Sequence, residues 1–364
     1  MTSRIRVAVL FGGKSSEHAI SCISAGSVLR AIDRAKYEVI PVGITLGGQW
    51  VLVSDDNPIL SMSASEQPTV LPNGSSVQLV NLDGQANLEI RDAGSVVLTP
   101  IDVVFPALHG PYGEDGTIQG LLELADVPYV GSGVFSSAAS MDKSHMKAIL
   151  RDAGLNVGSY VVIADSMWIN EKDVAISLVN KLQYPLFVKP CRAGSSVGIT
   201  KVKSADQLMS AIEFARSHDP KVIVESSLEN VREIECGVLG GKTGPRASVC
   251  AEIVVHGNHE FYDFDAKYVD DAVELIVPAH LSEVVQARAQ SVAREVFTVM
   301  DCAGLARVDM FVVDQDIVVN ELNTMPGFTP ISMFPRMWAH SGIEYPQLID
   351  ELISDAMHRG IGLH

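Results

Sequence analysis

The sequence predicts an α/β protein in which an N-terminal doubly wound domain, built on a parallel sheet, is followed by a longer α+β region in two parts. Three observations predict this class. Apolar runs alternate with helical patterns through the first third of the 364 residues, strand patterns outnumber helices from about residue 140, and 47% of the residues are hydrophobic, which is enough to bury a large core.

The first third opens with a strand and a helix. The run RVAVLF predicts a buried strand, and apolar residues recur at helical spacing from Ile20 to Ile32, with Ser15 or Ser16 as the N-cap. The runs YEVIPVGI and IDVVFPAL predict further strands, and VPYVGSG closes the unit. The turn-rich stretch 54–100 between them predicts a loop with short hairpins.

After residue 140 the pattern becomes mainly antiparallel. A helix in MDKSHMKAILRDAG ends at Gly154, a helix after the strand VGITKV begins with a Ser204/Gln207 capping box, and a long helix runs from about Ser282 to Cys302. A hairpin follows, then a helix that Pro346 starts. We therefore expect three domains, at residues 1–139, 140–230 and 231–364.

Composition excludes several classes of function. The 44 acidic and 27 basic residues leave a formal charge of −17 without any Lys/Arg run, which argues against a nucleic-acid partner. No apolar run approaches the ~20 residues that span a bilayer, and the N-terminus is too short in apolar residues for a signal peptide, so we expect a cytoplasmic protein. Five scattered cysteines without a C-x-x-C pair indicate reduced thiols.

The stretch FGGKSSEHAIS after the first strand contains Gly-Lys-Ser, the end of a P-loop pattern. A P-loop needs a glycine five places before Gly13, where the turn presents backbone N–H groups to phosphate. That place is Ala8, inside the strand. We therefore reject a P-loop.

The segment ARVDMFVVDQDIVVNELNTMPGF predicts a hairpin that carries chemistry. If Asp314-Gln315-Asp316 forms a three-residue loop, Asp309 faces Glu321 and Arg307 faces Asn323, all four on one face. Facing carboxylates repel unless a positive charge lies between them. Two carboxylates and an amide oxygen suit Mg²⁺, which completes its shell with water and phosphate oxygens. The alternative is a solvated face without function.

Three other residues are weaker candidates when taken singly. Lys189 ends the strand PLFVK, and the loop CRAGSSVG after it has small residues that allow close approach of backbone N–H groups to phosphate. Lys143 lies on a helix and is otherwise an ordinary surface lysine. Glu225, after KVIV, is a candidate for an adenine or ribose contact and is otherwise a strand end.

Together these segments resemble a known family, the D-alanine–D-alanine ligases of the ATP-grasp superfamily, nearly from end to end. The resemblance rests on segments in the family's order and spacing: FGGKSSEHAIS, HGPYGEDGTIQG, MDKSHMK, FVKPCRAGSSVGITKV, FYDFDAKYVDD, RVDMF and NELNTMPGFTPISMFP. It implies an ATP-grasp fold for the α+β region and ATP-dependent ligation of two D-alanines through an acyl phosphate, for peptidoglycan precursor synthesis. It also implies a homodimer.

The resemblance implies roles for residues that bind the first substrate and ATP. Glu17 would hold the amino group of the first D-alanine, although a charge at a helix N-terminus is its plainer interpretation. Ser195 and Tyr268 would close the site by bonding Glu17. The other implied contacts are His109 with the first substrate, Lys267 with the γ-phosphate, Lys143, Lys189, Ser195 and Ser196 with phosphates, and Glu225, Leu228 and Glu233 with adenine and ribose.

For the reacting centre the resemblance implies an oxyanion site and two Mg²⁺ or Mn²⁺ ions. Arg307 and the Gly327 N–H would stabilise the oxyanion, and Ser332 would contact the second substrate's carboxylate. The metal ligands would be Asp309, Glu321 and Asn323. The acidic aromatic segment around Tyr268 would form a lid, or else a solvated hairpin. Cys191 and Ala193 depart from the serine and glutamate that many relatives have.

Three other functions remain alternatives. A ligase that adds D-lactate or D-serine is the nearest, but lactate-forming relatives carry histidine where this chain has Tyr268. Another ATP-grasp carboxylate ligase or carboxylase would share the metal hairpin without the SSEH and AKY segments. A nucleotide-binding regulatory protein would bind ATP without turnover.

Overall fold

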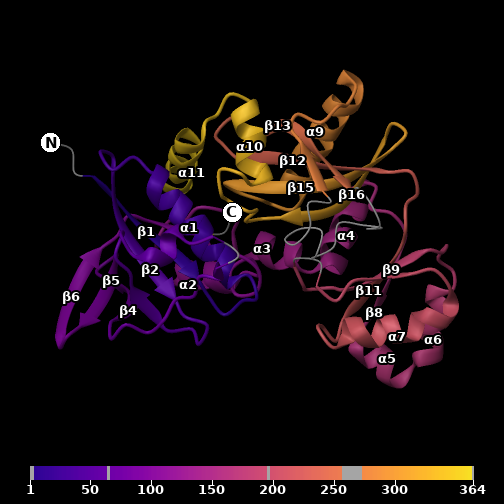
Figure 1. Ribbon diagram of the computed structural model, residues 1–364, viewed down its shortest axis with the longest axis horizontal. Coiled ribbons are helices and arrows are strands. Elements are labelled where there is room, and N and C mark those ends of the chain that lie inside the picture. The colour runs from indigo at the N-terminus through magenta and orange to yellow at the C-terminus, as the bar shows by residue number, and fades with distance from the viewer. Residues whose placement is uncertain (1–3, 64–65, 195–196, 256–272, 363–364) are drawn as a thin grey trace.

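The computed structural model describes residues 4–63, 66–194, 197–255 and 273–362, and Figure 1 shows how its elements are arranged. The N-terminal region contains a four-stranded sheet in the order β3-β2-β1-β7. β1 pairs in parallel with both β2 and β7, and only β3 at the edge is antiparallel. The elements of this sheet and its neighbours are β1 (Ile5–Gly12), α1 (His18–Ala31), β2 (Tyr37–Ile44), β3 (Trp50–Leu52), the 3₁₀ helix η1 (Pro58–Ser61), β7 (Val103–Pro106), α2 (Thr117–Leu124) and α3 (Val134–Met141).

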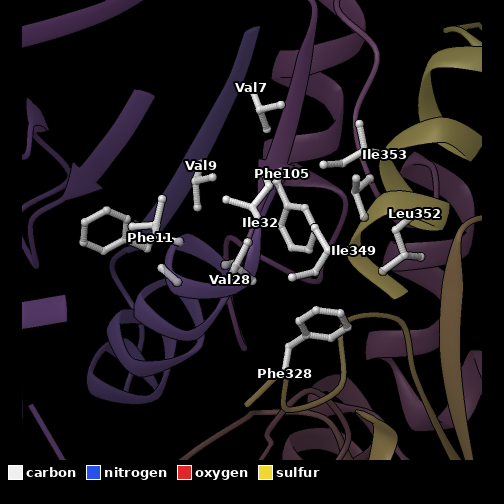
Figure 2. Packing of buried hydrophobic residues seen from close by; sticks show 14 of the residues in the cluster. Val7, Val9, Phe11, Val28, Ile32, Phe105, Phe328, Ile349, Leu352 and Ile353 are labelled. Atoms are coloured by element: carbon white, nitrogen blue, oxygen red, sulfur yellow. The ribbon is translucent and has the colours of Figure 1, made fainter. Parts of the chain in front are cut away.

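Side chains that alternate along β1 enter two different cores, as expected for a sheet covered on both faces. Val7, Val9 and Phe11 pack against α1 and the C-terminal helix α11 (Tyr345–Arg359), while Ala8 and Leu10 pack on the side of α2. Figure 2 shows Ile349, Leu352 and Ile353 of α11 facing Phe105 of β7. The end of the chain therefore completes the core of its beginning.

The turn-rich stretch folds as an antiparallel meander. β4 (Ser76–Leu82) pairs with β5 (Gln85–Asp92), which pairs with β6 (Ser95–Pro100). Both connecting turns have residues with positive φ, Asp83 with Gly84 and Ala93 with Gly94, as tight two-residue hairpins require. The predicted hairpins are confirmed.

A second sheet, in the order β10-β9-β11-β8, lies at the lower right in Figure 1 and is antiparallel throughout. The helices α5, α6 and α7 pack on it through one apolar cluster. The sequence analysis missed α5 and α6, which are only six and eight residues long. This region consists of α4 (Lys143–Asp152), β8 (Tyr160–Ile163), α5 (Asp165–Asn170), α6 (Lys172–Val179), β9 (Leu186–Pro190), β10 (Thr200–Val202), α7 (Ala205–Arg216) and β11 (Val222–Ser226).

The third sheet, in the order β14-β13-β12-β15-β16, is also antiparallel and lies at the top in Figure 1. One face packs against α9 and the other against α10, a helix that the sequence analysis did not predict. The elements are β12 (Arg232–Leu239), β13 (Arg246–Val255), β14 (Val273–Ile276), α9 (Glu283–Val299), β15 (Leu305–Val313), β16 (Asp316–Asn323) and α10 (Met333–His340). Helices at Ser282 and Pro346 begin as predicted, because Ser282 caps α9 and Pro346 lies in the first turn of α11.

Two helix starts differ from the prediction. α1 begins at His18 because Ser15 forms the preceding turn: its carbonyl accepts the His18 N–H and its hydroxyl accepts the Glu17 N–H. Ser204 is the N-cap of α7, but Gln207 accepts the N–H of Lys203 at 2.9 Å, one residue before the expected donor. The Ser204 hydroxyl donates to Asp206 and makes no cap bond with the helix, so the predicted capping box is not formed.

The β15–β16 hairpin has the predicted pairing for a different reason. The loop contains two residues, Asp314 and Gln315, and Asp314 has a φ of 55°. With unbroken pairing this shorter loop would place Asp309 opposite Asn320. A β-bulge after Asp309 adds one residue to β16, so Arg307 faces Asn323 and Asp309 faces Glu321. The predicted three-residue loop was wrong, and the predicted partners are confirmed.

In the described part of the chain, no helix combines the length and apolar character needed to cross a bilayer. The division of the chain at residues 139 and 230 stays a proposal.

We expect Leu352→Ala to lower the free energy of unfolding by about 2–5 kcal/mol, because Leu352 is 1% exposed in the core that α11 shares with the first sheet. Urea denaturation measures this loss. Met357→Ala on the same helix is the control, since Met357 is 39% exposed and should change stability little. If Leu352→Ala lowered the free energy of unfolding as little as Met357→Ala does, α11 would not belong to this core.

Candidate active site

A cavity of about 530 Å³ lies between the second and third sheets. It has apolar walls from both sheets, among them Phe187, Phe311 and Val318, and a group of charged side chains at one end. Six residues that the sequence analysis selected line it: Lys143, Lys189, Glu225, Leu228, Glu233 and Glu321. Apolar walls with a charged end suit a ligand that has a planar apolar part and an anionic part.

Glu225 is held between two lysines, Lys147 and Lys189. Its carboxylate oxygens lie 3.1 Å from the Lys147 Nζ and 2.7 Å from the Lys189 Nζ, and all three side chains are buried or nearly so. Burial acts to raise the pKa of Glu225, but the charges of Lys147 and Lys189 outweigh it and lower that pKa to about 2. Burial lowers the pKa of Lys147. The cluster therefore keeps a carboxylate charged inside the cavity.

Lys143, at the start of α4, connects this cavity to the hairpin. Its Nζ lies 3.2 Å from the Glu321 Oε2 and donates to the carbonyl of Ala193 at 3.1 Å. Burial opposes the charged form, yet Glu321 outweighs it and raises the pKa of Lys143. Lys143 therefore connects the loop CRAGSSVG, residues 191–198, to β16, and it is not an ordinary surface lysine. We call this loop the glycine-serine loop.

Three carboxylates stand in a row across the third sheet. Glu235 on β12 pairs with Asp309 on β15, which pairs with Glu321 on β16. Arg307 neutralises the row: it binds Asp309 through two bonds of 2.7 and 2.6 Å and lies 3.2 Å from Glu235. Asn323 donates to Asp309 at 3.0 Å.

This arrangement corrects one step of the sequence argument. The repulsion between Asp309 and Glu321 is relieved by the cations of Arg307 and Lys143, so it does not by itself require a metal ion. In the ranges that the structure describes, no group of three His, Cys, Asp or Glu side chains has the arrangement of a metal site. The oxygen donors of Asp309, Glu321 and Asn323 nevertheless share one face.

Glu17 lies where the first region meets the glycine-serine loop. A Cβ atom built on Gly110 would come 2.5 Å from the Glu17 Oε2, and one on Gly194 would come 3.2 Å from it. Both glycines therefore allow close approach of the backbone to this carboxylate. His109 is buried nearby and takes part in two hydrogen bonds, with the carbonyl of Met325 at 3.1 Å and with the Ser24 hydroxyl at 2.9 Å. Burial lowers the pKa of His109.

Gly327 and Ser332 belong to the turn that follows β16. A Cβ atom on Gly327 would lie 3.2 Å from the Ser332 Oγ, and the Ser332 hydroxyl lies 2.7 Å from the Thr329 hydroxyl. The structure therefore brings these two predicted residues together. Four predicted site residues, Ser195, Ser196, Lys267 and Tyr268, lie outside the described residues, as does the predicted lid around Tyr268.

Comparison with known proteins shows the family of the chain. The family model described as D-ala D-ala ligase N-terminus matches residues 6–132, and the model described as D-ala D-ala ligase C-terminus matches residues 149–354. The chain belongs to the D-alanine–D-alanine ligase family.

Relatives in this family match along the whole chain. A D-alanine--D-alanine ligase of Arthrobacter sp. (strain FB24) is 52% identical, with 98% of this chain and 95% of that protein covered. One from Mycolicibacterium vanbaalenii is 51% identical, and all of both chains is covered.

Solved structures of D-alanine–D-alanine ligases and related ligases have the same fold. The D-alanine-D-alanine ligase of Coxiella burnetii matches with a TM-score of 0.82 and 34% identity, covering 98% of this chain and 94% of that one. VanG D-Ala:D-Ser ligase of Enterococcus faecalis matches with a TM-score of 0.85 and 35% identity, covering 97% and 99%. The chain thus has the ATP-grasp fold that the sequence resemblance implied.

Several residues of this candidate site were not found from the sequence. Lys147 lies four residues after Lys143, so helical spacing places both on one face and was a usable signal. Glu235 follows Glu233 by two residues on one strand, which was a similar signal. For Ser24 and Glu114 no sequence pattern indicated a role, because their partners lie far away along the chain.

We expect Glu225→Gln to destabilise the protein at pH 7, because it leaves two buried lysines without their counter-charge. Since the pKa of Glu225 falls on folding from 4.5 to about 2, its stabilising contribution is complete above the unfolded value and is lost as the pH falls toward the folded one. The difference in Tm between wild type and variant should therefore narrow between about pH 5 and about pH 2.

Thermal melts across this pH range measure the effect. The control is Glu229→Gln, which removes the same charge from an exposed position in the same region. A difference in Tm that is independent of pH would contradict the assigned ion pairs.

Proposed function

We propose that the protein catalyses ATP-dependent joining of two D-alanine molecules to D-alanyl-D-alanine, a step in peptidoglycan precursor synthesis. The observation that carries the proposal is the cavity between the two antiparallel sheets. It has buried lysines at one end, and beside it lies the row of carboxylates that Arg307 and Lys143 compensate. The membership of the chain in the D-alanine–D-alanine ligase family supplies the substrate class.

ATP would lie in this cavity. Adenine would occupy the apolar part near Leu228 and Phe187, with Glu225 and Glu233 at the polar edges of adenine and ribose. Lys143 and Lys189 would bind phosphate oxygens, together with Ser195, Ser196 and Lys267. The positive charge of these lysines favours the phosphates and offsets the charge that spreads over the transferred group.

The first D-alanine would bind between the first region and the hairpin. Glu17 would accept hydrogen bonds from its ammonium group, and His109 would lie beside that group. Its carboxylate attacks the γ-phosphorus of ATP, the bond to the β-phosphate oxygen breaks, and an acyl phosphate and ADP form. A free carboxylate is a poor electrophile, so this step provides a leaving group. Ser195 and Tyr268 would close the site, because the acyl phosphate must be kept from water.

The second D-alanine would bind with its carboxylate at Ser332. Its neutral amine attacks the acyl carbonyl and a tetrahedral oxyanion forms. The C–O bond to phosphate then breaks, and one amine proton leaves with the phosphate as the peptide bond is completed. Arg307 and the Gly327 N–H would stabilise the oxyanion. Fixed donors of this kind act strongly because they need no reorganisation during the reaction.

The residues present also fit Mg²⁺ or Mn²⁺. Asp309, Glu321 and Asn323 supply two carboxylates and an amide on one face of the hairpin, a hard-oxygen donor set. We propose that they hold two such ions, which would neutralise the phosphate oxygens of ATP. We further propose a homodimer that acts in the cytoplasm, with domain boundaries near residues 139 and 230.

The proposed function is tested by ADP release. We expect D-alanine to stimulate ADP release from ATP and Mg²⁺, with D-alanyl-D-alanine found by mass spectrometry, and L-alanine to give only background. Reactions that contain D-alanine with D-serine or D-lactate show whether another second substrate is preferred. ATP binding without ADP release in any of these reactions would indicate a nucleotide-binding protein without turnover.

We expect Arg307→Lys to lower turnover by about 10²–10³-fold. Arginine binds Asp309 through two N–H groups and has further N–H groups for the oxyanion, whereas lysine keeps the positive charge but cannot hold Asp309 in this way and also present a fixed donor. Turnover is measured as ADP release at saturating substrates. Arg288→Lys on the exposed side of α9 is the control and should keep wild-type turnover. A loss of less than about tenfold in Arg307→Lys would refute the role.

A further inference from the structure

The backbone of Met325 is bound on both sides by side chains of the loop between β7 and α2. The His109 Nδ1–H donates to the Met325 carbonyl at 3.1 Å, and the Met325 N–H donates to the Glu114 Oε1 at 3.3 Å. These partners are 216 and 211 residues apart in sequence. A residue two positions before Gly327 is therefore fixed by the N-terminal region.

The side chains of Glu114 and His109 are themselves held by further hydrogen bonds. The Gly110 N–H donates to the Glu114 Oε2 at 2.5 Å, and the Ser24 hydroxyl of α1 donates to the His109 Nε2 at 2.9 Å. Burial lowers the pKa of His109 and so favours the neutral ring, in which Nδ1 carries the proton donated to Met325 and Nε2 accepts from Ser24. Gly110 has a φ of 72° and approaches Glu17 closely. His109 and Glu114 thus link Met325 to the place where the first substrate would bind.

We propose that Glu114 is a positioning residue for the ligase reaction: with His109 it clasps Met325 and so sets the position of the Gly327 N–H relative to the reacting carbonyl. The clasp consists of the His109 and Glu114 side chains on the Met325 backbone. The inference rests on the proposed function. A donor in an oxyanion site acts only at the correct distance, and a displacement of about 1 Å costs on the order of 10²-fold in rate.

The charges around Glu114 explain why this residue costs stability. The groups that face it are Glu17 before α1, Arg307 on β15 and the neutral His109 of its own loop. Burial, and then the charge of Glu17, raise the pKa of Glu114 to about 8, although the Gly110 and Met325 N–H groups and Arg307 act in the opposite direction. Because the folded pKa exceeds the unfolded value, the folded state loses stability as the pH rises through about 8.

Glu114→Gln separates positioning from stability. Glutamine keeps the shape but has only one acceptor oxygen. In an assay at about pH 8.5, above the pKa of Glu114, it therefore cannot bind the Gly110 and Met325 N–H groups as the ionised carboxylate does. It also has no charge to bury. We therefore expect turnover with D-alanine to fall by about tenfold to a hundredfold, while the Tm at about pH 8.5 is equal to that of the wild type or higher. The KM for ATP should be unchanged, because Glu114 does not line the ATP cavity.

The matched control is Asp115→Asn. Asp115 is the next residue in the same loop, but its carboxylate accepts from Tyr112 and Thr117 of its own loop and does not reach Met325. Turnover of this variant should stay within about threefold of the wild type. Any larger loss would show that the loop as a whole, and not the clasp, controls turnover.

Two results with Glu114→Gln overturn the inference. Turnover reduced by less than about tenfold would show that the clasp does not set the reacting geometry. Turnover that falls together with the Tm would show that Glu114 only holds the fold together. The wild type in the same ADP assay tests the proposed function separately: without D-alanine-dependent ADP release the proposed function fails, whereas a fully active wild type and an equally active Glu114→Gln sink the clasp alone.

Discussion

The row of carboxylates across the third sheet is the constraint on which the site depends. Glu235, Asp309 and Glu321 pair directly across three strands, where like charges destabilise a sheet. Arg307 and Lys143 compensate this charge, and Lys143 also donates to the carbonyl of Ala193. The pairing of acids therefore fixes Lys143 at the wall of the cavity, where a ligand with phosphates would meet it.

The buried cluster of Glu225 with two lysines fits the same explanation. Burying three charged groups costs desolvation free energy that a hydrophobic replacement would avoid, so such a cluster is weak evidence for stability. Its charged form is nonetheless maintained, as the lowered pKa of Glu225 indicates. Two lysines that need an anionic partner are suited to exchange a carboxylate for phosphate oxygens when a nucleotide binds.

The contact between the ends of the chain joins these parts into one site. Helix α11 completes the core of the first sheet, and Figure 2 shows Phe328, next to Gly327, in the same cluster. The Phe328 carbonyl accepts the Tyr345 hydroxyl at 2.7 Å, and Met325 is held by His109 and Glu114. The turn that would bear the oxyanion donor is thus fixed from the N-terminal region and from α11.

The sequence by itself determined the sheet classes, the long helices and the charged face of the β15–β16 hairpin, because periods of 2.0 and 3.6 residues are local properties of the chain. It did not reveal α3, α5, α6 and α10, which are too short for a clear period, or the bulge that corrects a shorter loop. Only the tertiary structure decided that Lys143 and Arg307 neutralise the acids and that Glu114 binds Met325. The contacts of Lys143 with Glu321 and of Glu114 with Met325 join residues far apart in the sequence, 211 positions in the second case, and no local pattern encodes them.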